Sequence, residues 1–143
     1  MIRAAALADV DAIVVIESDC FGTDAWSATL VAAAVEGERS TVLIDDLDAY
    51  GVIAVAGDVA DLERIAVMPS RRRQGVAGRV LDALCVAARA QDADRMLLEV
   101  AADNDAAIAF YDAYGFTTIS RRTGYYRGGV DALVMQLELQ EDR

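Results

Sequence analysis

A turn rich in arginine lies between an apolar run that ends at Met68 and a periodic apolar segment that begins near Gly75. It holds four of the chain's 13 basic residues within nine positions, namely Arg71, Arg72, Arg73 and Arg79. If a helix starts at Gly75, its first N–H groups have no partner within the helix, and the helix dipole adds about half a positive charge there. The turn therefore predicts an anion-binding site, and the alternative is a solvated turn without a ligand.

The residues around Gly75 narrow the kind of anion. Gly75 lets the backbone approach a phosphate closely, and Ala77 keeps the second position of close approach small. The sequence contains neither a G-K-[ST] phosphate loop nor a G-x-G-x-x-G dinucleotide fingerprint. The loop therefore indicates a phosphate-bearing cofactor of another kind.

Composition excludes several classes of function. The chain has no histidine, which removes Ser-His-Asp and Cys-His catalytic arrangements and the commonest zinc ligand. Cys20 and Cys85 lie far apart and match no metal spacing, so we expect neither a metal site nor a disulfide. A net charge of −11 argues against a nucleic-acid partner, because phosphate backbones are bound by clustered Lys and Arg. Acid–base chemistry must then come from carboxylates, tyrosine, cysteine, lysine-like groups or water.

We also expect a cytoplasmic protein without a membrane partner. No window approaches the ~18 apolar residues needed to cross a bilayer. Asp9 and Asp11 stand where a signal peptide would be most apolar.

Hydrophobic periodicity predicts the elements that must position the arginine-rich turn. We expect strands over 2–6, 41–44, 50–56, 62–68, 96–100, 116–122 and 132–138. We expect helices in a segment opened by Asp9, in one capped by Ser27 that ends at Gly37, from about 75 to 88, and in one capped by Asn104 that ends at Gly115. A loop is expected over 19–26 and a turn over 57–61. Pro69 is the only proline and no linker is apparent, so residues 1–143 are expected to form one domain.

The order of these elements indicates the fold class. Three successive strands over 41–68 suggest an antiparallel meander, whereas the strand, helix, strand passage over 62–100 implies a parallel pair with a right-handed crossover. We therefore expect an α/β fold with a mixed, mostly antiparallel sheet, about four flanking helices and one parallel strand pair beside the arginine-rich turn.

Two motifs resemble a known family. Residues 72–77 read R-R-Q-G-V-A and fit the [QR]-x-x-G-x-[GA] cofactor loop of the GNAT acetyltransferases, and residues 65–69 fit the I-A-V-x-P that usually precedes it. Residues 98–100 read L-E-V, and residues 103–116 read D-N-D-A-A-I-A-F-Y-D-A-Y-G-F. Both closely resemble a segment of the RimI-type members of that family, which acetylate the N-terminal alanine of a ribosomal protein. The likeness covers residues 60–137.

The resemblance implies the GNAT fold and acetyl-CoA as the cofactor. In that fold the pantetheine arm inserts between two parallel strands that part near their ends, which here would be 62–68 and 96–100. The cofactor-binding residues it implies are Ile65, Ala66, Val67, Arg72, Arg73, Gln74, Gly75, Val76, Ala77, Gly78, Asn104 and Tyr111.

By the same resemblance Glu99 is the general base, through water, and Tyr111 is the general acid that protonates the coenzyme A thiolate. The spacing agrees, since Glu99 ends its strand and Asn104 and Tyr111 stand two helical turns apart on one face. The alternatives are Glu63 as the base, Glu99 as a plain strand-end charge and Tyr111 as a core aromatic.

For the acceptor, the resemblance implies a site bordered by Phe21 and Trp26 of an F-x-x-D-x-W-S element, with Glu63, Tyr125 and Tyr126. The alternative for the two tyrosines is that they are ordinary aromatic residues of a strand. The implied acceptor is the N-terminal α-amino group of a protein such as a ribosomal protein, which an acidic surface would suit. The alternatives are a small amine, a lysine side chain, or an acyl-CoA-binding module without turnover. Ala101 stands where the family usually has Arg, so one charge of the acceptor pocket is missing.

Overall fold

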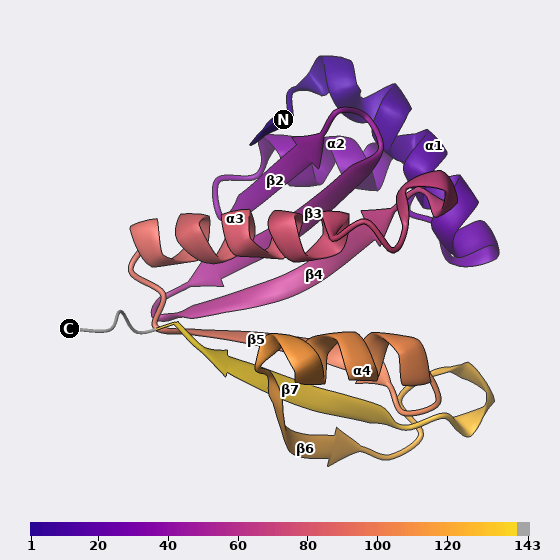
Figure 1. Ribbon diagram of the computed structural model, residues 1–143, viewed down its shortest axis with the longest axis vertical. Coiled ribbons are helices and arrows are strands. Elements are labelled where there is room, and N and C mark those ends of the chain that lie inside the picture. The colour runs from indigo at the N-terminus through magenta and orange to yellow at the C-terminus, as the bar shows by residue number, and fades with distance from the viewer. Residues whose placement is uncertain (140–143) are drawn as a thin grey trace.

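Seven strands form one mixed sheet in the order β1-β2-β3-β4-β5-β7-β6 in the computed structural model of the chain, which describes residues 1–139 (Figure 1). The strands are β1 (Ile2–Ala4), β2 (Ser40–Asp45), β3 (Ala49–Ala56), β4 (Val59–Val67), β5 (Arg95–Ala101), β6 (Thr117–Arg122) and β7 (Ala132–Glu138). The α-helices within the described residues are α1 (Val10–Phe21), α2 (Ala28–Glu36), α3 (Val76–Ala90) and α4 (Asp105–Tyr114). The predicted order of elements and the fold class are confirmed. Of the expected domain 1–143, residues 140–143 lie outside the described part.

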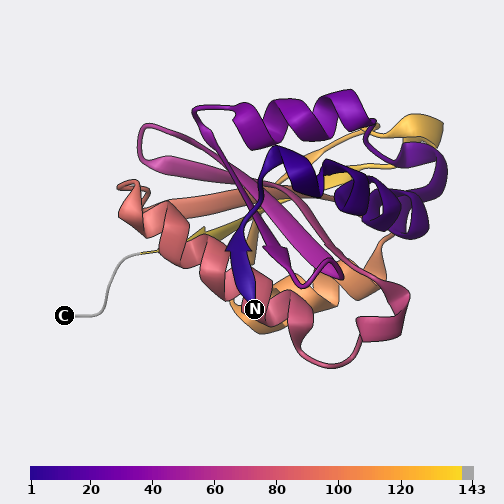
Figure 2. The same cartoon turned by 90° about the horizontal axis from the view of Figure 1, so that it is seen from above.

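The helices cover both faces of the sheet (Figure 2). α3 and α4 lie on one face, where their apolar residues share a core with the strands. α1 and α2 lie on the other face, around a second core that contains Ile13, Ile16 and Val31. None of the helices within residues 1–139 is long and apolar enough to cross a membrane.

The buried face predicted for the helix after Pro69 is confirmed. The residues that α3 buries are Val76, Val80, Leu81, Leu84, Cys85 and Ala88, a spacing of three and four that gives one apolar stripe. The helix packs closely on β3 because Gly51 has no side chain. A Cβ at Gly51 would lie 2.7 Å from Leu84 Cδ1 and 3.1 Å from Val80 Cγ1. Gly51 therefore allows α3 its close approach to the sheet.

Two predicted helix caps are confirmed. Ser27 Oγ accepts a hydrogen bond from Leu30 N at 3.2 Å, and Asn104 Oδ1 accepts one from Ala107 N at 3.2 Å. Each bond satisfies one N–H that the start of a helix leaves unpaired, which stabilises the helix by about 1 kcal/mol. These caps fix where α2 and α4 begin.

The predicted start of α1 is confirmed, since Asp9 is the residue directly before the helix. Asp9 belongs to a short 3₁₀ turn, and its carboxylate binds Arg3 and Ala6 N instead of capping the helix. A salt bridge to Arg3 of β1 thus holds the residue at which α1 begins.

The expected loop over 19–26 is partly wrong. α1 continues to Phe21, and a second 3₁₀ turn occupies Gly22–Asp24. Gly22, whose φ is 55°, ends the helix, because this left-handed backbone favours glycine. The buried Ile16 and Glu17 anchor the end of α1 to the sheet, and that packing is not visible in the local sequence.

The hairpin between β3 and β4 is tighter than the expected five-residue turn. Ala56 pairs with Val59, so the turn consists of Gly57 and Asp58 alone. Gly57 has a φ of 61°, a conformation that two-residue hairpin turns require and that glycine adopts without strain. β4 therefore begins at Val59, three residues earlier than predicted.

β4 and β5 form the predicted parallel pair, but over a different and shorter stretch. The pairing joins Val59–Asp61 to Arg95–Leu97 and ends there. Beyond it the two strands diverge (Figure 1), while β4 stays paired with β3 and β5 with β7. The segments expected to pair, 62–68 and 96–100, therefore lie mostly where the strands part, and the facing edge of β4 keeps unpaired backbone groups.

Candidate functional site

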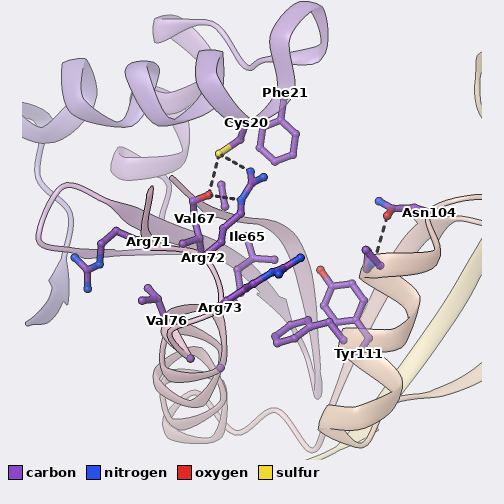
Figure 3. A pocket seen from close by; sticks show the side chains of 17 residues that line it. Cys20, Phe21, Ile65, Val67, Arg71, Arg72, Arg73, Val76, Asn104 and Tyr111 are labelled. Carbon is purple, nitrogen blue, oxygen red and sulfur yellow. Dashed lines mark hydrogen bonds between the residues drawn. The ribbon is translucent and has the colours of Figure 1, made fainter. Parts of the chain in front are cut away.

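A first pocket of about 550 Å³ lies where β4 leaves β5, between the end of α1, the N-terminus of α3 and one face of α4 (Figure 3). It brings together eleven of the twelve residues predicted to hold the cofactor, which are Ile65, Ala66, Val67, Arg72, Arg73, Gly75, Val76, Ala77, Gly78, Asn104 and Tyr111. Gln74 does not line it, because its Nε2 donates to Ser70 O at 3.4 Å. Segments separated by more than thirty residues in the sequence thus form one cavity.

The N-terminus of α3 opens into this pocket. Gly75 directly precedes the helix with a φ of 76°, and because glycine has no side chain it cannot cap the helix. The first intrahelical bond to its carbonyl comes from Arg79 N at 3.1 Å, so the N–H groups of residues 76–78 have no partner within the helix. Since Val76, Ala77 and Gly78 all line the pocket, these donors and the positive end of the helix dipole are available to an anion.

The four arginines of the turn differ in what they contact. Arg71 forms an ion pair with Asp48 at 2.5 Å, and Arg79 Nη1 donates to Gln74 O at 3.0 Å. These two therefore brace the turn.

Arg71 lines the cavity as well, and so do the remaining two arginines. Arg72 Nε donates to Val67 O at 3.0 Å, and its Nη2 lies 3.6 Å from Cys20 Sγ. Arg73 adopts a positive φ of 64° and extends its side chain into the pocket toward Tyr111 (Figure 3). The cavity is therefore electropositive in a chain whose net charge is −11.

Tyr111 is both a core aromatic and a lining residue. Its ring makes edge contacts with Phe110 and Phe116, with centroid distances of 5.3 and 5.5 Å. Its hydroxyl points into the pocket toward β4 (Figure 3). Burial raises the pKa of Tyr111 to about 12, so the phenol keeps its proton at neutral pH.

A second pocket of about 560 Å³ lies against the part of β4 and β5 where the two strands begin to separate. Its lining residues include Trp26, Asp61, Glu63, Glu99, Arg122, Tyr125 and Tyr126. Four of the five residues predicted for the acceptor are among them. The exception is Phe21, which lines the first pocket instead. Phe21 and Trp26, members of one predicted motif, thus face different cavities.

Glu99 reaches the second pocket because side chains alternate along β5. Leu98 and Val100 are buried in the core that α3 and α4 cover, so Glu99 points to the opposite face. Arg122 Nε lies 2.7 Å from Glu99 Oε2, and the Tyr125 hydroxyl donates to Oε1 at 3.2 Å. Tyr125 and Tyr126 lie in the connection between β6 and β7, not in a strand as the alternative had it.

Two further carboxylates share this pocket with Glu99. Burial, with a contribution from Asp61, raises the pKa of Glu63, and burial, with a contribution from Glu99, raises the pKa of Asp61. Glu63 and Glu99 therefore both remain available as a base. Within residues 1–139, no group of three or more such side chains is arranged to bind a metal ion.

Several lining residues were not predicted. Cys20, Arg71, Ala106, Ala107 and Phe110 line the first pocket, and Asp61 and Arg122 line the second. Helical spacing from Asn104 and Tyr111 could have indicated Ala107, and strand alternation from Glu63 could have indicated Asp61. No local sequence pattern indicated that Arg122 lines this pocket, because it reaches Glu99 across an intervening strand.

Comparison with known proteins gives consistent matches. The family model described as the acetyltransferase (GNAT) family matches residues 15–116. The [ribosomal protein bS18]-alanine N-acetyltransferase of Salmonella typhimurium is 35% identical to this chain over 98 residues. The match covers 66% of this chain and 66% of that enzyme, which is just under two thirds of the enzyme's length.

The solved structures agree with this match. The crystal structure of the ribosomal-protein-S18-alanine N-acetyltransferase from Escherichia coli is 31% identical and has a TM-score of 0.87, covering 100% of this chain and 96% of that one. A structure of YncA, a putative acetyltransferase from Salmonella typhimurium with its cofactor acetyl-CoA, shares the fold at 21% identity, with a TM-score of 0.79 over 100% of this chain and 95% of that one.

Proposed function

Because the chain belongs to the GNAT acetyltransferase family, we propose that it transfers an acetyl group from acetyl-CoA to the N-terminal α-amino group of a protein, such as a ribosomal protein. One observation carries the proposal. β4 and β5 part beyond Asp61 and Leu97, with an electropositive pocket that contains Tyr111 at one side of the gap and a carboxylate-lined pocket that contains Glu99 at the other.

The first pocket suits the phosphates and the thioester arm of acetyl-CoA. Unpaired N–H groups at the start of α3, with Arg72 and Arg73, would hold the pyrophosphate. The edge of β4 at Ile65–Val67, which β5 does not pair, would offer backbone N–H groups to the amide-containing arm, and Asn104 and Tyr111 line the same pocket. Acetyl-CoA, when bound, supplies an acetyl group already activated as a thioester.

The chain's own residues would then move two protons. Glu99, through water, would take a proton from the acceptor ammonium, whose ordinary pKa is ~8, so a weak base suffices. The Tyr111 hydroxyl would give its proton to the departing sulfur. A phenol with a pKa of about 12 is a weaker acid than a thiol at ~8.5, so transfer of this proton is uphill by itself. It would move as the carbon–sulfur bond breaks, and the phenolate would regain the proton that the nitrogen loses as the amide forms. Glu63 is the alternative base, since it lines the same pocket as Glu99.

The choice of a protein N-terminus rests on two supports. The relatives that match at 31 and 35% identity act on the alanine of ribosomal protein S18. The acidic chain and the carboxylates of the second pocket would attract a basic polypeptide that carries a free ammonium group. We also propose that residues 1–143 act as one domain and that the protein works in the cytoplasm, as its acceptors would require.

A peptide panel tests the proposal. Purified protein with acetyl-CoA is given short peptides that begin with Ala, Ser, Met or an acetylated Ala, together with an internal-lysine peptide and polyamines, and the products are read by mass spectrometry. We expect acetylation at the free N-terminus of the Ala peptide to exceed all others. Preferred acetylation of lysine or of a polyamine would favour the small-amine alternative. Thermal stabilisation by coenzyme A without any thiol release would favour a binding module.

A further inference from the structure

Arg64 of β4 lies at the partition between the two pockets. Its neighbours in the strand serve different cavities, since Glu63 lines the second pocket and Ile65 lines the first. The Arg64 guanidinium lies over the Phe21 ring, 3.8 Å from its centroid, and 5.0 Å from the centroid of Trp26. Phe21 is a wall of the first pocket and Trp26 a wall of the second. A single side chain therefore contacts one wall of each pocket.

A fully buried carboxylate orients Arg64. Glu17 of α1 has 0% of its surface exposed and accepts hydrogen bonds from Arg64 Nε at 2.9 Å and from Arg64 Nη2 at 2.7 Å. It also accepts hydrogen bonds from Trp26 N, at 2.7 Å, and from the Tyr50 hydroxyl. Burial alone would raise the pKa of Glu17, but these donors hold it below its ordinary value. The bidentate contact fixes the plane of the guanidinium, which a single hydrogen bond would not.

The same guanidinium fastens the backbone between the two aromatic residues. Arg64 Nη2 donates to Asp24 O at 2.9 Å, in the 3₁₀ turn Gly22–Asp24. This turn has no buried residue of its own. A short segment with so little packing depends on the few contacts made to it for its position.

We propose that Arg64 is a positioning residue that sets both pockets at once, holding Phe21 at the cofactor side and Trp26 at the acceptor side; the acceptor part rests on the proposed function. Arg64 itself touches no reacting atom. Its planar cation stacks on two rings while donating three hydrogen bonds. A lysine ammonium has the charge but not this geometry.

Arg64→Lys tests the proposal, with Arg3→Lys as its matched control. Arg3 forms a bidentate pair with Asp9 near the other end of α1, with both N–O distances 2.7 Å, and lines neither pocket. We expect R64K to weaken coenzyme A binding, measured by calorimetry, and to raise the KM for a peptide acceptor, each by about fivefold to tenfold. R3K should lower the melting temperature yet leave both constants within about twofold. Constants for R64K that also stay within about twofold would overturn the proposal.

Fluorescence gives a readout that needs no turnover. Trp26 is the only tryptophan of the chain, so its quenching by acrylamide reports on the segment that Arg64 holds. Quenching should increase in R64K and stay unchanged in R3K. Unchanged quenching in R64K would show that Arg64 does not hold Trp26.

A double-mutant cycle separates positioning from general loss of stability. Phe21→Ala should weaken coenzyme A binding when it is made in the parent. When it is added to R64K, it should weaken binding further by less than about twofold, because the two side chains act through one contact. Fully additive losses would contradict the proposal. If R64K does not fold, Glu17→Gln takes its place with the same readouts, and values within about twofold of the parent overturn the proposal.

The experiment also distinguishes failure of the function from failure of this inference. A parent protein that binds coenzyme A but acetylates no acceptor would refute the proposed function. The coenzyme A affinities and the quenching of Trp26 would still test whether Arg64 positions Phe21 and Trp26.

Discussion

Arg122 of β6 contacts Glu99 of β5, with Arg122 Nε 2.7 Å from Glu99 Oε2, although β7 lies between the two strands. The Tyr125 hydroxyl donates to the other oxygen of Glu99 at 3.2 Å, and the Arg122 guanidinium lies 5.5 Å from the centroid of the Tyr125 ring. Ala101 leaves no cation two positions further along β5. Arg122 therefore places a positive charge beside Glu99 from another strand.

Arg122→Gln should impair turnover more than cofactor binding. Glutamine can still hydrogen-bond, but it lacks the positive charge that Arg122 places 2.7 Å from Glu99 Oε2, so we expect kcat/KM for a peptide acceptor to fall by about tenfold. Coenzyme A affinity should stay within about twofold, because Arg122 does not line the first pocket. Arg121→Gln is the control, since Arg121 pairs with Asp131 at 2.6 Å and lines neither pocket. Equal losses in both variants would argue against a specific role for Arg122.

Tyr111→Phe should lower kcat by about 10²–10³, the usual contribution of a general acid, with coenzyme A affinity within about twofold. Tyr114→Phe is the control, because Tyr114 lies on the same helix and donates to Asp82 at 2.5 Å without lining either pocket. Since the pKa of Tyr111 is raised to about 12, its acid form persists at neutral pH and is lost only as the pH rises toward that value. If steady-state assays find the same kcat for Y111F and the parent, Tyr111 is not the general acid.

Gly78→Ala should stabilise the fold and weaken cofactor binding together. Gly78 lies within α3 and a Cβ there meets no atom within 4 Å, so alanine should raise stability by about 0.5–1 kcal/mol through helix propensity. That corresponds to a rise in Tm of about 2–5 °C. The added methyl group occupies space beside the first pocket, so coenzyme A affinity should fall by about threefold to tenfold. A higher Tm with unchanged affinity would mean that the anion does not approach α3 at Gly78.

Asp9→Asn should reduce the sensitivity of the fold to acid. Hydrogen bonds from Arg3 and from Ala6 N lower the pKa of Asp9 from 3.8 to about 2. A carboxyl group with a lowered pKa in the folded state stabilises the protein above its unfolded pKa, and this contribution is lost as the pH falls from about 4 through 2. Thermal melts should therefore show a smaller loss of Tm over this range in D9N than in the parent, with D9N the less stable of the two at pH 7. Identical losses would show that the Arg3–Asp9 pair does not couple folding to protonation.

Much of the architecture was predictable because its signals are local. The stripe on α3 and the caps Ser27 and Asn104 depend on residues within one or two helical turns, so their spacing predicts them directly. The two-residue turn at Gly57 and the end of α1 at Phe21 were mispredicted. In both places neighbouring residue types allow more than one conformation, and pairing or packing elsewhere decides.

The sequence by itself determined the family and predicted where the cofactor would bind, because the arginine-rich turn, Gly75 and the helix that follows are contiguous and the prediction depends on adjacent residues. The tertiary structure alone decided which cavity each side chain serves. Phe21 and Trp26 belong to one short motif yet face different pockets, and Arg64 meets Glu17 from 47 positions away. The point at which β4 leaves β5 is likewise a relation between distant segments, since the pairing joins Val59–Asp61 to Arg95–Leu97 and ends there. Contacts over such separations leave no periodic or neighbouring pattern in a single sequence.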